Sequence, residues 1–170
     1  MRFEGDAGDL VINGTAYRLR QLHWHAPTEH TVGGRRYDME LHLVHESAAG
    51  KAAVVGVLYE VGAAPDPFLS ALEPAIGRVA ERRDMEEDVG VVDPRRARGR
   101  ASVYYRYMGS LTTPPCTEGV VWTVFQKVNR LLGSCGGLVV ASSSFLVLYL
   151  CRLATWPSTS WSFSGMRWMT

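Results

Sequence analysis

The stretches Gln21–His30 (QLHWHAPTEH) and Met39–His45 (MELHLVH) together contain all five histidines of this 170-residue chain. Arg18–His25 alternates between two sets of side chains, which predicts a strand with Leu19, Gln21, His23 and His25 on one face. Tyr37–His45 alternates in the same way, with Glu40, His42 and Val44 on one face. Gly33-Gly34 predicts a turn between the two strands, so we expect them to pair antiparallel with His42 facing His23 and His25.

This histidine pattern is typical of a metal site. Residues i and i+2 of a strand lie about 6.5–7 Å apart on the same face, so His23 and His25 can reach a common point. Zn²⁺ takes four tetrahedral ligands, and three neutral imidazoles leave one position open for water, as in catalytic zinc sites. Gln21 and Glu40 each lie two residues from a histidine and on its face, where they could accept the second ring N–H.

A plainer interpretation exists for every histidine. A single histidine on a half-buried strand is usually a packed, hydrogen-bonded residue, and only the combination of three favours a metal. His30 follows Pro27 in a predicted turn, and His45 points to the face opposite His42. We therefore interpret His30 and His45 as structural.

Most of the remaining sequence before residue 129 is predicted to form strands. Asn13-Gly14 supplies the positive φ angles of a tight hairpin within Asp9–Leu19. The apolar, β-branched run Ala52–Val61 predicts a buried strand, and apolar residues at helical spacing predict a helix over Pro67–Arg83. Two further strands are predicted, with an irregular loop over 109–119 between them: Tyr104–Met108 and Val120–Val128.

Composition and charge exclude several classes of protein. The net charge of +1 gives no strong field toward nucleic acid, and the basic run Arg95–Arg100 is interpreted as a solvated loop. Three cysteines without a CxxC pair argue against a zinc knuckle or a thioredoxin-type site. The first ten residues, MRFEGDAGDL, lack the basic and apolar regions of a signal peptide.

The character of the sequence changes after Val128. Residues 131–170 contain no Asp, Glu or Lys and hold three of the five tryptophans. The apolar run Leu138–Leu150 is interrupted by serines and is shorter than the roughly 20 residues that a transmembrane helix needs. We interpret 129–170 as an aberrant Ser/Trp-rich apolar tail with no family match, and a membrane partner is not expected.

Three segments together resemble the α-class carbonic anhydrases, and most of all the plant members. They are QLHWHAPTEHTVGG, DMELHLVHES and YYRYMGSLTTPPCTEGVVWTV, within a match that runs from about Phe3 to Val128. The resemblance implies a mainly β fold, with a large, mostly antiparallel, twisted central sheet and a few short helices. It also implies that 1–128 is a partial catalytic domain, because complete members begin earlier and continue with further strands.

The family's residue roles transfer to matching positions in this sequence. The resemblance implies that His23, His25 and His42 bind Zn²⁺ and that Gln21 and Glu40 support them. It implies that Thr112 hydrogen-bonds the zinc-bound hydroxide and donates its own proton to Glu29. It implies a cis bond between Pro114 and Pro115, and it leaves Cys116 without a disulfide partner. The substrate pocket would be lined by six further residues: Val44, Val54, Leu111, Thr113, Val120 and Trp122.

The function implied is the reversible hydration of CO₂ to bicarbonate and a proton, by attack of zinc-bound hydroxide. The partners are then CO₂ and bicarbonate, while the oligomeric state stays open. A secreted or plastid location would follow from the family, although this chain shows no targeting segment. Two alternatives remain: a non-catalytic carbonic anhydrase-like storage or binding protein, or a truncated inactive product.

Overall fold

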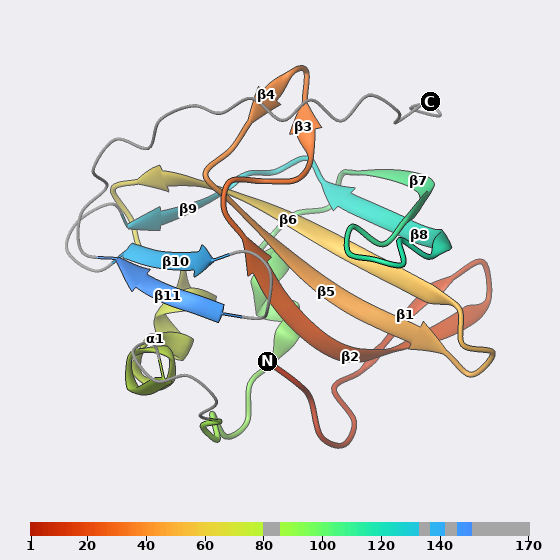
Figure 1. Ribbon diagram of the computed structural model, residues 1–170, viewed down its shortest axis with the longest axis horizontal. Helices are drawn as coiled ribbons and strands as arrows, with labels where there is room; N and C mark the ends of the chain where they lie inside the picture. The colour runs from red at the N-terminus through yellow and green to blue at the C-terminus, as the bar shows by residue number, and fades with distance from the viewer. Residues whose placement is uncertain (80–85, 133–136, 142–145, 151–170) are drawn as a thin grey trace.

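A computed structural model describes residues 1–79, 86–132, 137–141 and 146–150 of the chain. Its main feature is a seven-stranded sheet in the order β1-β2-β5-β6-β8-β7, with β9 also paired to β6 (Figure 1). Neighbouring strands run antiparallel except where β6 meets β8 and β9, both of which lie parallel to it. The predicted mainly β fold with a large, mostly antiparallel sheet is confirmed.

Six of the seven strands of the main sheet overlap the predicted segments, and β9 was not predicted. Those of the main sheet are β1 (Asp9–Ile12), β2 (Thr15–His25), β5 (Met39–Ser47), β6 (Ala52–Gly62), β7 (Tyr104–Ser110), β8 (Glu118–Phe125) and β9 (Asn129–Leu132). The hairpin between β1 and β2 turns at Asn13 and Gly14, whose φ angles are 49° and 76°. Positive φ at both positions matches the twist of the flanking strands.

Short hairpins and helices complete the described chain. The turn at Gly33-Gly34 joins β3 (Thr31–Val32) to β4 (Arg35–Arg36), and β10 (Gly137–Ala141) pairs with β11 (Leu146–Leu150) in a separate two-stranded sheet. The helix α1 spans Pro67–Val79, and a 3-10 helix, η1, spans Pro94–Arg98. The end of the predicted helix at residues 80–83 lies outside the described residues, as do most of residues 133–170.

The sheet carries apolar residues on both faces. One face packs against α1 through Phe68 and Leu72, and it includes Leu41, Val57 and Tyr59. The opposite face carries Val54, Leu58, Val120, Trp122 and Val124. Strand β6 contributes alternate residues to the two faces, and every residue from Ala53 to Tyr59 is buried, as predicted for a central strand.

The predicted alternation of β2 is wrong at one position. Leu19 packs with Leu22 and Trp24 on the α1 face instead of sharing a face with His23. The ladder between β2 and β5 shifts register between Leu19 and Gln21, where Arg20 is an extra residue. Such a β-bulge reverses the facing of the side chains that precede it, so only Gln21, His23 and His25 keep the predicted face.

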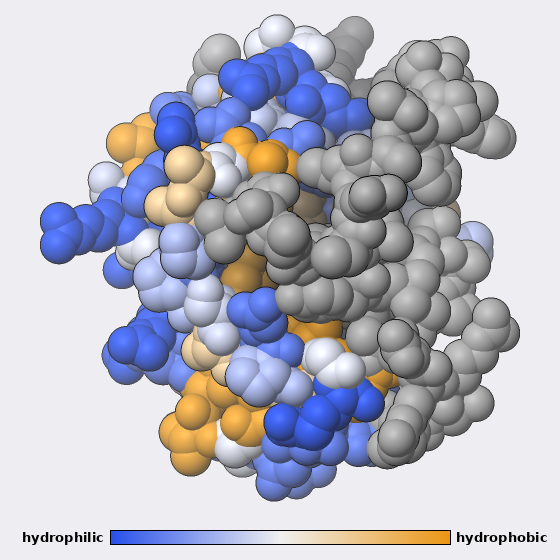
Figure 2. Space-filling model, turned by 90° about the vertical axis from the view of Figure 1, so that its left-hand side faces the viewer, coloured by the Kyte–Doolittle hydropathy of each residue, from blue (hydrophilic) through white to orange (hydrophobic). Residues whose placement is uncertain are grey.

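The described part of the face seen in Figure 2 has no single dominant character. Figure 2 shows hydrophilic side chains spread over the face that is turned to the viewer, with apolar residues in separate groups between them. Among the described residues, no helix combines the length and apolar character needed to cross a membrane. The Arg95–Arg98 part of the basic run lies in η1, where its arginines are exposed and Ala97 alone is buried.

Candidate metal centre

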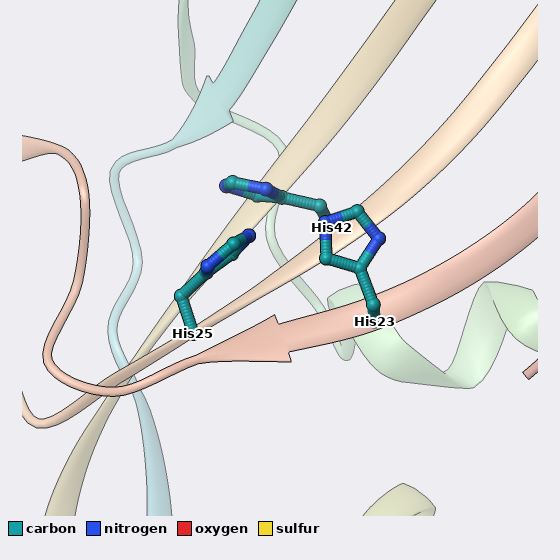
Figure 3. A group of neighbouring side chains, drawn as sticks. All are labelled: His23, His25 and His42. Atoms are coloured by element: carbon teal, nitrogen blue, oxygen red, sulfur yellow. The ribbon is translucent and has the colours of Figure 1, made fainter. Parts of the chain in front are cut away.

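His23, His25 and His42 converge on the face of the sheet opposite α1. His23 and His42 lie directly across the β2–β5 ladder from each other, and His25 lies two residues further along β2. Figure 3 shows the three rings gathered over these two strands. Their centroids are 4.7–5.3 Å apart. The antiparallel pairing predicted from the sequence is therefore what brings the histidines together.

Gln21 and Glu40 lie beside the outer nitrogens of two of these rings, and Gln21 fixes the tautomer of His23 by a hydrogen bond. Gln21 Oε1 lies 2.9 Å from His23 Nδ1 and can only accept, so His23 carries its proton on Nδ1 and keeps a lone pair on Nε2. Glu40 Oε1 lies 2.9 Å from His42 Nε2, close enough for an ion pair but without hydrogen-bond geometry, so this contact does not fix the tautomer of His42. Gln21 and Glu40 thus lie next to His23 and His42, and their supporting roles stay a prediction.

Glu40 is buried, and its carboxylate contacts both backbone and side-chain groups around the histidines. Its Oε2 accepts the backbone N–H groups of Glu29 (3.0 Å) and His30 (2.9 Å), and its Oε1 contacts His30 Nδ1 at 2.5 Å. Burial alone would raise the pKa of Glu40, but hydrogen bonding to His30 and the neighbouring His42 hold that pKa well below its usual range. The carboxylate is therefore ionised and has its acceptor positions filled.

The sequence analysis did not assign His30 or Tyr107 to this network. His30, interpreted only as structural, is 2% exposed and links Glu40 to Tyr107, whose hydroxyl lies 2.6 Å from His30 Nε2. Since Nδ1 faces a carboxylate, Nε2 accepts from the Tyr107 hydroxyl. Tyr107 comes from β7, 77 positions away in the sequence, and no local pattern signals so distant a partner.

Two of the three candidate ligand histidines, His23 and His25, are held in their neutral form. Burial, together with the adjacent His42 and His25, lowers the pKa of His23 to about 3. Burial and the neighbouring His42 also lower the pKa of His25. Metal ligation requires the neutral imidazole, so these two rings are in the required state at neutral pH.

The donor atoms fit a zinc ion. One nitrogen from each of the three histidines lies within 4.8 Å of the other two, and a tetrahedral ion with Zn–N near 2.0–2.1 Å separates its donors by about 3.3 Å. His25 Nε2 is buried and has no hydrogen-bond partner among the described residues. Such an orphaned nitrogen is costly unless a ligand satisfies it. His30, Glu40 and His42 are also close enough for a metal, but their mutual contacts already occupy these atoms.

An apolar wall adjoins the histidines. Val54, Val120 and Trp122 are at most 2% exposed and belong to one cluster, against which Val44 and Leu111 pack. The Trp122 ring centroid is 4.8 Å from that of His42. Five of the six predicted pocket residues thus share one surface beside the metal centre, while Thr113 is exposed in the loop that precedes β8.

The family assignment follows from a sequence match that covers these elements. The family model for eukaryotic-type carbonic anhydrases matches residues 6–132. The chain belongs to this carbonic anhydrase family. The match includes every strand of the main sheet and all the residues of the metal centre. It ends with β9, and the interpretation of 129–170 as a separate tail stays a prediction.

Individual relatives agree with the carbonic anhydrase assignment. "Alpha carbonic anhydrase 2" of Arabidopsis thaliana is 51% identical over 126 residues, which are 74% of this chain and 51% of that protein. "Dioscorin DB3S" of Dioscorea polystachya is 51% identical over 128 residues, 75% of this chain and 47% of its own length. The chain therefore spans about half the length of the curated relatives that it matches.

Solved structures of carbonic anhydrases and a dioscorin have the same fold. A dioscorin complexed with ascorbate has a TM-score of 0.73 and 48% identity, and the match covers 78% of this chain and 55% of that one. The α-carbonic anhydrase of Thermovibrio ammonificans, solved with the inhibitor sulfanilamide, has a TM-score of 0.68 and 39% identity over 76% of this chain and 56% of its own.

The expected gate residues, Thr112 and Glu29, are placed less tightly than the three histidines. Thr112 is exposed, and Glu29 Oε2 is buried without a hydrogen-bond partner in the described chain. The expected Thr112–Glu29 hydrogen bond thus stays a prediction, although the oxygen that it needs is free. The Pro114–Pro115 bond is cis, as predicted, and Cys116 is a free, exposed cysteine.

Proposed function

We propose that this carbonic anhydrase chain hydrates CO₂ reversibly to bicarbonate and a proton, with Zn²⁺ held by His23, His25 and His42. The observation that supports the proposal most directly is the convergence of three imidazoles, one with its tautomer fixed by Gln21 and two with a buried Nε2 that has no hydrogen-bond partner in the described chain. Because the chain spans only about half of its relatives' length, their activity is taken as a hypothesis for this chain.

Zinc, when bound, supplies the Lewis acidity that activates water near neutral pH. The protein's part is to hold three uncharged donors, so that the positive charge of the ion is not offset by a carboxylate ligand. Gln21 and Glu40 fix the orientation of two rings, and burial of the site keeps competing protons off His23 and His25. A rigid ligand set of this kind leaves one position open for the reacting water.

Thr112 and Glu29 are proposed to orient the attacking water. An ionised carboxylate can only accept, so Thr112 must donate its hydroxyl proton to Glu29 Oε2. The lone pair of the Thr112 hydroxyl then accepts a hydrogen bond from the water, and this aims the oxygen at the substrate carbon. Fixing the orientation of the attacking water can remove a large part of the free-energy barrier of a bimolecular reaction.

The apolar wall is proposed to bind CO₂, which has no charge and no donor group. Val54, Val120 and Trp122 bury polarisable surface next to His42 without offering a competing hydrogen bond. Val44 and Leu111 would complete the wall, with Thr113 at its mouth. Bicarbonate, being an anion, gains little from such a surface, and this favours release of the product.

The test is a CO₂ hydration assay on the purified chain, with zinc and with an excess of chelator. We expect a zinc-dependent rate that His42→Gln abolishes. His45→Gln is a matched control, because His45 lies on the same strand but on the face opposite His42. Circular dichroism must show that both variants fold. A well-folded, zinc-loaded chain with no rate above background would refute the proposal.

A second candidate is a non-catalytic binding protein, and the similarity to the dioscorins favours it. A dioscorin has been solved with ascorbate, so calorimetric titration of this chain with ascorbate, with and without zinc, is the corresponding test. This candidate would be favoured if the chain bound ascorbate and its rate of CO₂ hydration stayed at background in the presence of zinc. An inactive, unstable product would instead show no cooperative thermal transition by circular dichroism.

A further inference from the structure

Of the three proposed ligand histidines, His25 has the most distant outer acceptor among the described residues. His23 Nδ1 has Gln21 at 2.9 Å, and His42 Nε2 has Glu40 at 2.9 Å. His25 Nδ1 faces Glu29 instead, with the nitrogen and Oε1 3.6 Å apart. That distance is slightly too long for a hydrogen bond, but both side chains are partly exposed (20% and 30%), so either can rotate to close it.

We infer that Glu29 is the positioning residue of His25, in addition to any contact with Thr112. A metal-bound histidine almost always donates its other ring N–H to a carboxylate, carbonyl or water, which fixes the tautomer and the direction of the ring. Donation from Nδ1 to Glu29 Oε1 leaves the lone pair on Nε2. That nitrogen is the buried, unpartnered atom of His25, as a ligand to the proposed zinc must be.

The backbone makes Glu29 the carboxylate available to His25. Glu40 is the other acid whose charge raises the pKa of His25, but its two oxygens are taken by His30, by His42 and by two backbone N–H groups. One of those N–H groups belongs to Glu29 itself (3.0 Å). Glu40 therefore anchors the backbone of Glu29 beside the cluster, and the Glu29 side chain extends toward His25.

The inferred role and the proposed gate use different oxygens of one carboxylate. Oε1 faces His25, whereas Oε2 lies 4.0 Å from His42 Nδ1, has no hydrogen-bond partner in the described chain and can still accept from Thr112. Glu29 would then connect the ligand set to the gate. Loss of Glu29 should weaken zinc binding, whereas loss of the Thr112 hydroxyl should not, and this difference separates the inference from the gate role alone.

The inference rests on the proposed zinc site and is tested by zinc affinity rather than by activity. The full chain and its variants are titrated with zinc against a chromophoric chelator, and their folding is checked by circular dichroism. We expect Glu29→Ala to lose roughly 10- to 100-fold in zinc affinity, the usual effect of losing an outer-shell partner. Glu29→Gln keeps a carbonyl acceptor and should lose less, and Thr112→Val should bind zinc like the wild type.

Long-range ¹H–¹⁵N spectra of the zinc-loaded chain supply a second readout. The wild type and Thr112→Val should show His25 protonated on Nδ1, with slow exchange of that proton, and Glu29→Ala should lose the slow exchange. Unchanged zinc affinity in Glu29→Ala would overturn the inference, as would an equal loss in Thr112→Val. If Glu29→Ala does not fold, the zinc affinity of Glu29→Gln is compared with that of the wild type instead. A wild-type chain that binds no zinc overturns the proposed function, and this inference with it.

Discussion

Gly56 lies across the β5–β6 ladder from His42, and a Cβ atom on Gly56 would stand 2.8 Å from Glu40 Oε1. A second contact, 3.3 Å from the same Cβ to Val124 Cγ2, closes the other side of the space. The carboxylate of Glu40 is held by two histidines and two backbone N–H groups, so it cannot yield without losing some of them. The absence of a side chain at position 56 is thus a condition for the support of His42.

Gly56→Ala should therefore weaken both folding and metal binding. Overpacking a core typically costs about 1–3 kcal/mol, and displacement of Glu40 should lower zinc affinity by releasing His42. Urea unfolding and zinc competition measure the two effects. Gly77→Ala in α1 is the control, since a Cβ there meets nothing within 4 Å and should stabilise the helix by up to about 1 kcal/mol. Wild-type zinc affinity in Gly56→Ala would contradict the account of Glu40.

Zinc should stabilise the folded chain by mass action. A ligand that binds only the native state adds about 2.7 kcal/mol at a free concentration 100 times its dissociation constant. Thermal unfolding should accordingly move to higher temperature with zinc and return with a chelator. His23→Gln should lose this increment, because it removes one of the three donors. An equal zinc-induced shift in His23→Gln would show that the metal binds elsewhere.

The alternation of polar and apolar residues predicted β5 and its facing correctly, because the period of two holds throughout Met39–Ser47. In β2 the same rule placed Leu19 on the wrong face. The bulge at Arg20 adds one residue to one strand only, and nothing in the local composition marks it. The histidines were unaffected because they follow the bulge.

The supporting network was predictable only in part. Gln21 and Glu40 could be proposed as supporting residues because each stands two residues from its histidine on a shared strand face. The contacts of His30 were not found, because its partners come from β5 and β7 and depend on the completed sheet. The family resemblance supplied the gate roles of Thr112 and Glu29, for which a single sequence carries no geometric signal.

His45 should make the chain less stable in acid. Burial lowers the pKa of His45, although hydrogen bonds to the backbone at Leu43 and Ala53 and the charge of Asp9 partly oppose this. The unfolded chain therefore takes up a proton near pH 6.5 before the folded chain does, and stability falls as the pH decreases below that value. With chelator present, His45→Gln should reduce the proton uptake on unfolding by up to about one. Urea unfolding between pH 7.5 and 5 measures this, and an unchanged slope would contradict the prediction.

Asp66 should contribute to stability as the N-cap of α1. Its Oδ1 accepts the backbone N–H groups of Phe68 (2.9 Å) and Leu69 (3.0 Å), which have no partner within the helix. Asp66→Ala leaves both donors unsatisfied and should cost about 1 kcal/mol, the usual effect at such a position. Asp66→Asn keeps an acceptor oxygen and should lose only a fraction of this. Because α1 packs on the face opposite the histidines, zinc affinity should not change in either variant, and a parallel loss of zinc binding would show that the two faces are coupled.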